Sequence, residues 1–231
     1  MLILEATAVT PQGRITPGCL GLYDDATEEA LAGVVRMMRS VAPIPLALQI
    51  SHAGRKGSSG RPWEGGALIG AADGGWQTVA PSALALKDGE TAPNALGHAD
   101  LEELRVRFVE TAVRADRLGF DAIELHAAHG YLLHQFLSPI GNQRSDHYGG
   151  PLENRMRFPL EIIAAMRAAW PAHKPLGVRI SATDWIEGSG WDVPDATEFA
   201  RRCEARGVDW IDVSRSEEHT SELQSRFGIS Y

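Results

Sequence analysis

The sequence predicts an α/β fold with a parallel β-sheet, and two observations lead to this prediction. Five short apolar runs have the length and composition of buried strands, and stretches with apolar residues at helical spacing lie between them. The five runs cover residues 2–7, 45–50, 120–125, 176–181 and 208–213. Alternation of this kind is typical of repeated βαβ units, whose chemistry lies at the carboxyl ends of the strands.

The N-terminal part of the chain supplies two of these strands and one helix. Asp24 is expected to start the helix, because acidic residues follow it near the positive helix end. Its inward face is predicted from helical spacing to consist of Leu31, Val34, Val35 and Met38. After Ser51-His-Ala-Gly-Arg-Lys56, residues 57–97 lack a helical period. A stretch this long without a regular element usually covers a site.

Three more helices are expected in the rest of the chain. Asp100 is predicted to cap a helix over residues 100–118, which Gly119 ends. Proline at a first-turn position opens the next two helices, over residues 151–170 and 194–203. Apolar residues at helical spacing give the first of these three helices its inward face: Leu101, Leu104, Phe108, Ala112 and Ala115.

Composition and charge exclude several classes of protein. The chain has 231 residues, 44% of them hydrophobic and 23% charged, which is ordinary for a globular protein. Its net charge of -8 comes from interspersed acids without a basic stripe, so we expect no nucleic-acid partner. No apolar run approaches the roughly 20 residues of a membrane span, and the N-terminus does not resemble a signal peptide. Two cysteines make no disulfide framework, so we expect a cytoplasmic protein.

The last part of the chain does not continue the pattern of strands and helices. Residues 215–231 are a polar tail where a helix is expected, and residues 215–225 resemble the conceptual translation of a sequencing-adapter oligonucleotide. We therefore expect one domain over residues 1–214 and a non-native tail over residues 215–231. A natural solvated tail is the alternative, and the genomic sequence of the locus decides between them.

The candidate catalytic residues lie directly after the third predicted strand. His126, His129 and Tyr131 fall within six residues of one another. Two imidazoles on one loop can donate two hydrogen bonds to a substrate oxygen, an oxyanion-type stabilisation. A phenol, with an ordinary pKa of about 10, stays protonated at neutral pH and can act as a general acid. The alternatives are histidines satisfied within the core and an aromatic ring that packs the loop.

A metal site formed with His134 is the competing interpretation of the same histidines. Zinc prefers a closed set of three or four ligands with supporting hydrogen bonds around it. No acid or cysteine in this stretch clearly completes such a set, so we predict no metal.

Taken together, these motifs resemble the Old Yellow Enzyme family of FMN-dependent ene-reductases, which fold as TIM barrels. The His-Ala-Gly-Arg-Lys and His-x-x-His-x-Tyr signatures indicate its bacterial branch. The resemblance covers nearly the whole chain to Ser214, in the family's order, and implies a partial (β/α)8 barrel with about five of its eight βα units. The matching segments are Glu5–Arg14, Gln49–Lys56, Pro62–Gly65, Glu124–Pro139, Asn142–Phe158 and Val178–Ser181.

The resemblance also implies roles for individual residues. FMN would be the cofactor and NADH or NADPH the hydride source, while His126 and His129 bind the carbonyl oxygen of an α,β-unsaturated substrate. Tyr131 would bind the substrate and donate a proton; in some relatives the aligned tyrosine mainly binds substrate, and water is then the alternative proton donor. Gln49 would bind the pyrimidine edge of the flavin, since an amide is both donor and acceptor. Arg179 would face the N1–C2 edge of the flavin.

Each cofactor residue has a structural alternative. Gln49 could satisfy backbone groups at a strand end. Arg179, costly to bury without an anionic partner, could pair with Glu5 or Glu124 instead. Ala6 matches a family position whose backbone approaches the flavin, and its alternative is core packing.

The implied activity is an NAD(P)H oxidoreductase that reduces activated C=C bonds. We expect the chain as given to be an inactive fragment, because the family's first strand would precede residue 1 and its phosphate-binding strands would follow Ser214. A metal- or Schiff-base-dependent lyase, with Lys56 as the nearest lysine, and a non-catalytic binding module remain alternatives. The sequence leaves open the substrate, the choice of NADH or NADPH, and whether the parent protein is a homo-oligomer.

Overall fold

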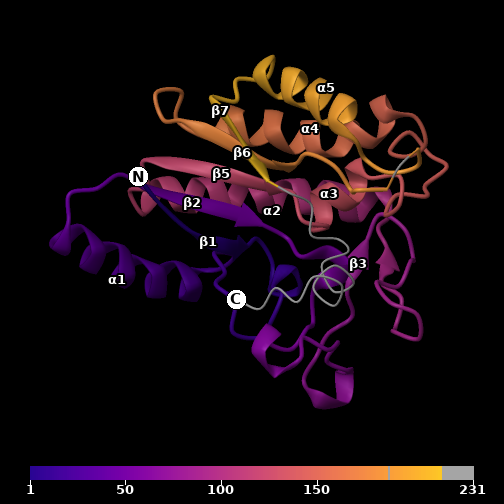
Figure 1. Cartoon of the computed structure of the whole chain (residues 1–231). Coiled ribbons are helices and arrows are strands. Elements are labelled where there is room, and N and C mark those ends of the chain that lie inside the picture. Colours follow the sequence, from indigo (N-terminus) through magenta and orange to yellow (C-terminus); the bar gives the residue numbers. More distant parts are fainter. Residues whose placement is uncertain (187, 215–231) are drawn as a thin grey trace.

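The computed structural model describes residues 1–186 and 188–214, and five parallel strands form its main sheet (Figure 1). The order across the sheet is the order along the chain, as in the successive βα units of a TIM barrel. All five predicted strands are present, with ends that shift by at most two residues. They are β1 (Leu2–Ala8), β2 (Leu46–Ser51), β5 (Ala122–Ala127), β6 (Leu176–Ser181) and β7 (Trp210–Ser214).

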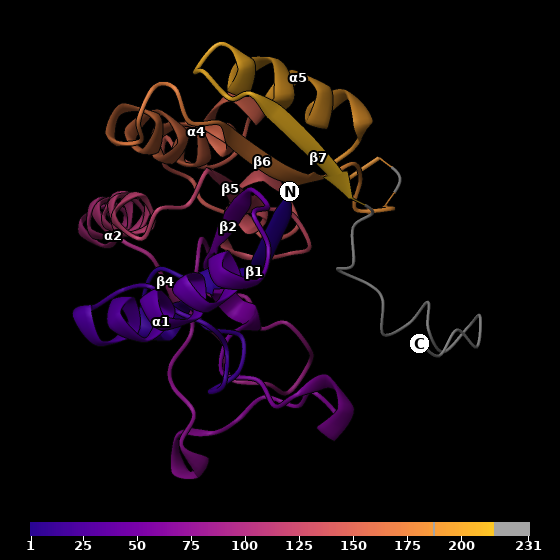
Figure 2. The same cartoon turned by 90° about the vertical axis from the view of Figure 1, so that its left-hand side faces the viewer.

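Four long helices lie in an arc on one side of this sheet (Figure 2). They are α1 (Asp25–Val41), α2 (His98–Arg117), α4 (Leu152–Ala169) and α5 (Val193–Glu204). Large side chains from three of them, Phe108, Phe158 and Phe199, are buried in one cluster with alternate strand residues such as Leu48 and Ile123. The core therefore lies between the helices and one face of the sheet.

The helix starts agree with the sequence in one case and differ in another. Asp24 caps α1 as predicted, and its carboxylate accepts a hydrogen bond from the Thr27 N–H at 2.8 Å. In contrast, α2 begins at His98, two residues before the predicted cap. Asp100 is its third residue and accepts from the Gly97 N–H at 2.7 Å, so the capping signal is real but belongs to the first turn.

Two further predictions about helices were wrong or incomplete. Val34 is 43% exposed, whereas Leu31 and Val35 on the same helix are buried, so the inward stripe of α1 is narrower than the spacing suggests. A short helix, α3 (Leu132–Leu137), follows β5 and was not predicted. Its six residues are all buried, which hides the polar and apolar alternation that identifies a helix.

The long segment after β2 contains only short elements, as its composition predicts. They are η2 (Gly54–Lys56), η3 (Pro62–Glu64), η4 (Ala71–Asp73) and the parallel pair β3 (Val79–Ala80) and β4 (Asn94–Ala95). Figure 1 shows this segment extending beyond the carboxyl end of β2.

Across residues 1–186 and 188–214, no helix is both long enough and apolar enough to cross a membrane. The expectation of a non-native tail concerns residues 215–231, which lie outside the described part of the chain.

Candidate active site

The sheet face opposite the helices carries polar side chains in layers, and Glu124 ties the first layer together. Gln49, Glu124, Gly177 and Trp210 are paired in register on four adjacent strands, so their side chains share this face. The Glu124 carboxylate accepts from the Gln49 amide at 2.7 Å and from the Trp210 indole N–H at 3.2 Å. Gly177 makes room for this arrangement, because a Cβ there would lie 1.9 Å from the Trp210 ring.

The second layer lies two residues nearer the carboxyl ends and contains Arg179. His126 pairs in register with Arg179, and Arg179 with Asp212. The Arg179 Nε atom is 3.3 Å from a carboxylate oxygen of Asp212, so the ion pair forms with this residue and not with Glu5 or Glu124. Within the described residues this buried Nε nevertheless has no hydrogen-bond partner.

The three predicted catalytic side chains come together in this layer and just beyond it. The His126 ring lies edge-on to His129, with centroids 5.1 Å apart, and edge-on to Tyr131, with centroids 4.8 Å apart. His126 is the penultimate residue of β5, and Tyr131 is the N-cap of α3. A strand end and a helix start therefore place the three rings around one point.

His129 is held from three sides. Its N–H donates to the Ser181 hydroxyl at 2.9 Å, and its carbonyl accepts from the Lys56 ammonium at 2.7 Å. Its Nε2 atom is 2.6 Å from the Ser214 hydroxyl. The loops after β2 and the ends of β6 and β7 thus fix one histidine.

Both imidazoles are neutral at physiological pH. Burial, followed by the nearby His129 and Arg179, lowers the pKa of His126 well below its ordinary value. Burial, followed by the charge of Arg179, lowers the pKa of His129 to about 4. The His126 Nδ1 accepts from the Ala128 N–H at 3.2 Å, so the neutral ring carries its proton on Nε2. Such rings can polarise an oxygen by donating hydrogen bonds, without adding positive charge beside Arg179.

The described residues fit the flavin that the resemblance implies. The Arg179 Nε is buried and forms an ion pair with Asp212 but has no hydrogen-bond partner, so the guanidinium could still donate to an anionic ring edge. Gln49 is buried on the same face and has an amide that can both donate and accept. Ala6 lies in a β-bulge, since the register with β2 shifts between Leu4 and Thr7. A bulge interrupts the strand ladder locally, and Glu5 and Ala6 are the two residues within it.

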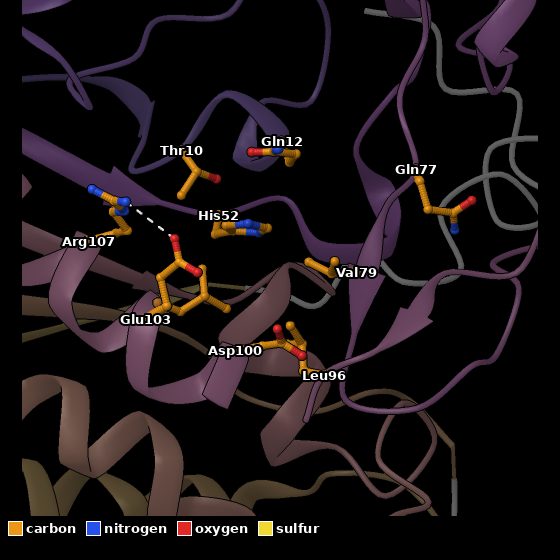
Figure 3. Close-up of a pocket in the computed structure, with 10 residues that line it drawn as sticks. Thr10, Gln12, His52, Gln77, Val79, Leu96, Asp100, Glu103 and Arg107 are labelled. Atoms are coloured by element: carbon orange, nitrogen blue, oxygen red, sulfur yellow. Dashed lines mark hydrogen bonds and ion pairs between the residues drawn. The ribbon is translucent and has the colours of Figure 1, made fainter. Parts of the chain in front are cut away.

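A separate pocket lies beside α2 (Figure 3). It encloses about 270 Å³ and is lined by residues of α2, of the loops after β1 and β2, and of the β3–β4 region. The buried His52 faces it, and burial lowers the pKa of this histidine to about 4. The charged groups that line the pocket are already paired: Arg107 with Glu103 at 3.2 Å, and Asp100 with the Gly97 N–H. The predicted site residues lie outside this pocket.

The two alternative chemistries find little support in the geometry. Within the described residues, no three or more His, Cys, Asp or Glu side chains are grouped so that they could hold a metal ion. His134, the third histidine of the motif, faces Asp184 and the Gly130 N–H. Lys56, the candidate for a Schiff base, donates to the His129 carbonyl and lies 5.8 Å from the Tyr131 ring centre.

Sequence reasoning missed the residues that support the site. Ser181, Asp212 and Ser214 contact Arg179 or His129, yet nothing in their local sequence marks them. Their position at the ends of predicted strands was the one available signal, because strand ends meet at one edge of a parallel sheet.

Comparison with known proteins identifies the family. Residues 1–225 match the NADH:flavin oxidoreductase / NADH oxidase family. The chain is 45% identical to an NADH:flavin oxidoreductase of Gibberella zeae, over 99% of this chain and 59% of that protein. It is 42% identical to an NADPH dehydrogenase of Clostridium acetobutylicum, over 82% of this chain and 51% of that protein. The chain therefore spans between half and three fifths of the length of these relatives.

Solved structures agree with the fold and the family. Morphinone reductase in complex with tetrahydroNAD superposes with a TM-score of 0.76 and 29% identity, over 97% of this chain and 64% of that one. The Old Yellow Enzyme homologue of Zymomonas mobilis gives a TM-score of 0.74 and 25% identity, over 91% and 59%. The five-stranded sheet is thus part of a TIM barrel. The chain belongs to the NADH:flavin oxidoreductase / NADH oxidase family, the Old Yellow Enzyme family of FMN-dependent NAD(P)H oxidoreductases.

Proposed function

We propose that the protein reduces activated C=C bonds of α,β-unsaturated carbonyl compounds. The observation that carries this proposal is the group of three rings, His126, His129 and Tyr131, at the carboxyl ends of the strands beside a buried arginine nitrogen without a hydrogen-bond partner. FMN, when bound, supplies the hydride, which it receives from NADH or NADPH.

His126 and His129 bind the carbonyl oxygen of the substrate. Hydrogen bonds from two neutral imidazoles to that oxygen withdraw electron density from the conjugated bond. The β-carbon then becomes the better hydride acceptor. Because the pKa of each ring is lowered, both remain in the required neutral form over the physiological range.

Tyr131 donates the proton that the α-carbon needs after hydride arrives at the β-carbon. Its ring lies edge-on to His126, so a carbonyl held by the imidazoles brings the adjacent carbon near the phenol. The Lys56 ammonium also lies close to the Tyr131 ring, 5.8 Å from its centre. A positioned phenol of this kind is a general acid.

Gln49, Arg179 and the backbone of Ala6 hold the flavin in this proposal. Arg179 would balance negative charge on the ring edge, and Gln49 would pair with the pyrimidine groups. Glu124 accepts from the Gln49 amide at 2.7 Å and so fixes the orientation of that amide.

We assign this reaction to the full-length protein, since the chain spans 59% of its fungal relative and 51% of its clostridial one. The family's phosphate-binding loops follow the last strands of the barrel. We therefore propose that the 231-residue chain alone binds FMN weakly and does not turn over.

The test is the visible spectrum of the protein after expression with FMN supplied and desalting. Flavin bands should remain with the full-length protein, bleach when NADPH or NADH is added without oxygen, and return when 2-cyclohexenone follows. A flavin that is reduced but that no enone reoxidises would contradict the proposed substrate class. The same experiment on the 231-residue chain measures how much FMN binding and how much of each half-reaction this part of the protein retains.

The Tyr131→Phe substitution separates the two half-reactions. We expect reoxidation by the enone to slow by about a hundredfold or more, the usual worth of a general acid, while reduction by the nicotinamide changes little. Equal slowing of both half-reactions would show loop damage in place of a lost proton donor.

A further inference from the structure

The loop that presents His129 contains two successive residues in the left-handed conformation. His129 has φ of 57° and Gly130 has φ of 67°. Glycine adopts this region freely, but a histidine there is strained, and such a residue persists only where its surroundings hold it. The strain therefore calls for specific restraints on this dipeptide.

Two neighbouring residues of α3 restrain Gly130. Its N–H donates to the Nδ1 atom of His134 at 2.8 Å, and its carbonyl accepts from the Gln135 amide at 2.6 Å. Gln135 also donates to the Ala53 carbonyl at 3.2 Å. Both side chains are fully buried, so water does not compete for these hydrogen bonds.

His134 is in turn oriented by a buried carboxylate on another loop. Its Nε2 atom is 3.0 Å from Asp184, which follows β6. Asp184 accepts from the Ser138 hydroxyl at 2.6 Å and from the Trp191 N–H at 2.9 Å. Because Nδ1 accepts from the Gly130 N–H, the ring proton lies on Nε2. Nε2 faces the Asp184 carboxylate at 3.0 Å, although the angles of this contact are not those of a hydrogen bond.

We propose that His134 is a positioning residue for the reaction proposed above, on which this inference rests. Its Nδ1 acceptor fixes the left-handed His129–Gly130 turn, and Asp184 fixes the His134 ring. The loop after β5 is thereby coupled to the loop after β6, and His129 is aimed at the substrate oxygen. His134 does not contact the substrate.

The test compares His134→Asn with His134→Leu in the 231-residue chain and in the FMN-loaded full-length protein. These two side chains have the same shape, but only asparagine keeps an acceptor at the δ position. In the chain, nitrogen-15 NMR of the Gly130 amide should show hydrogen exchange at least about tenfold faster with leucine than with asparagine, because one buried hydrogen bond is lost. His173→Leu, at an exposed histidine, is the matched control.

In the full-length protein, the affinity for 4-hydroxybenzaldehyde is read from the flavin spectrum. Its Kd should rise about fivefold to tenfold with leucine and recover most of the way with asparagine, while FMN stays bound. Equal Gly130 exchange in the two variants, or an unchanged Kd with leucine, would overturn the positioning role. A wild-type protein that keeps FMN but does not bind the aldehyde would overturn the proposed function instead, and the exchange result would still decide the role of His134 in the turn.

Discussion

The two faces of the central sheet differ in what their side chains do. On the helix side, residues such as Leu48, Ile123 and Val178 pack with phenylalanines of the helices. On the other side, Glu124 and Arg179 occupy the alternate positions of the same strands. Burial of apolar surface, worth roughly 25 cal/mol per Å², stabilises the fold on the first face. Directional hydrogen bonds orient groups on the second. Alternation along one set of strands therefore separates the residues that stabilise the fold from the residues that carry the chemistry.

The largest expected effect comes from breaking the apolar face. Phe108 is fully buried on α2, so Phe108→Ala removes a ring and leaves a cavity. We expect a loss of about 3–5 kcal/mol in the free energy of unfolding, measured by urea denaturation. Val106→Ala on the same helix is the control, because Val106 is 43% exposed and should change stability by less than about 0.5 kcal/mol. Similar losses for both variants would mean that α2 does not pack as described.

Substitutions of the histidines on the polar face should weaken ligand binding more than they lower the stability of the fold. In the full-length protein, His126→Ala with His129→Ala removes both proposed donors to the carbonyl oxygen. We expect phenol binding to weaken about a hundredfold, from two hydrogen bonds of roughly 1–1.5 kcal/mol each, with the flavin still bound. A double variant that binds phenols normally would refute the carbonyl-binding assignment.

The strands and the catalytic cluster could be predicted from the sequence, but the partners of the polar side chains could not. Strand runs and the His126, His129 and Tyr131 cluster are local patterns, so they could be identified from short windows. The partners of these residues depend on register between strands far apart in the chain. Arg179 meets Asp212 because β6 pairs with β7 in one particular register, and no local pattern fixes that register. An ion pair with Glu124 was equally compatible with the sequence.

The same distinction explains why the support of the loop was missed. Asp184 lies 50 positions after His134, in a loop with no regular pattern, yet its carboxylate oxygen is 3.0 Å from the ring. α3 has six residues, all buried, and thus lacks the exposed face that would reveal it. Sequence patterns identify groups that do chemistry more readily than the groups that orient them.

A smaller effect should follow from changing one atom type in the first polar layer. Glu124→Gln keeps the shape but replaces an acceptor oxygen with an amide NH2, which then faces either the Gln49 amide or the Trp210 N–H. We expect a loss of about 1–3 kcal/mol in the free energy of unfolding, the cost of a buried donor without a partner. Glu102→Gln, in an exposed pair with Arg105, should cost less than about 1 kcal/mol. Equal costs would show that Glu124 is not a structural acceptor.

The last expected effect is a pH dependence of stability to which the polar face contributes through His129. The pKa of His129 is about 4 in the folded protein, below the ordinary value of 6.5. Between these values the unfolded chain binds a proton that the folded chain does not, so stability falls as the pH drops from 6.5 towards 4 and His129 adds no further loss below that. His52, also at about 4, contributes in the same direction.

The His129→Asn substitution isolates the share of one imidazole in this dependence. The free energy of unfolding is measured by urea denaturation of the chain at pH values from 4.5 to 7.5. As the pH falls, it should decrease less steeply in the variant than in the wild type. The difference in slope should be at most about one proton, and smaller if solvent screens the partly exposed ring. His173→Asn, at an exposed position, should leave the slope unchanged. Parallel slopes for wild type and His129→Asn would mean that His129 titrates like an exposed histidine, and the neutral donor assigned to it would then be lost below about pH 6.5.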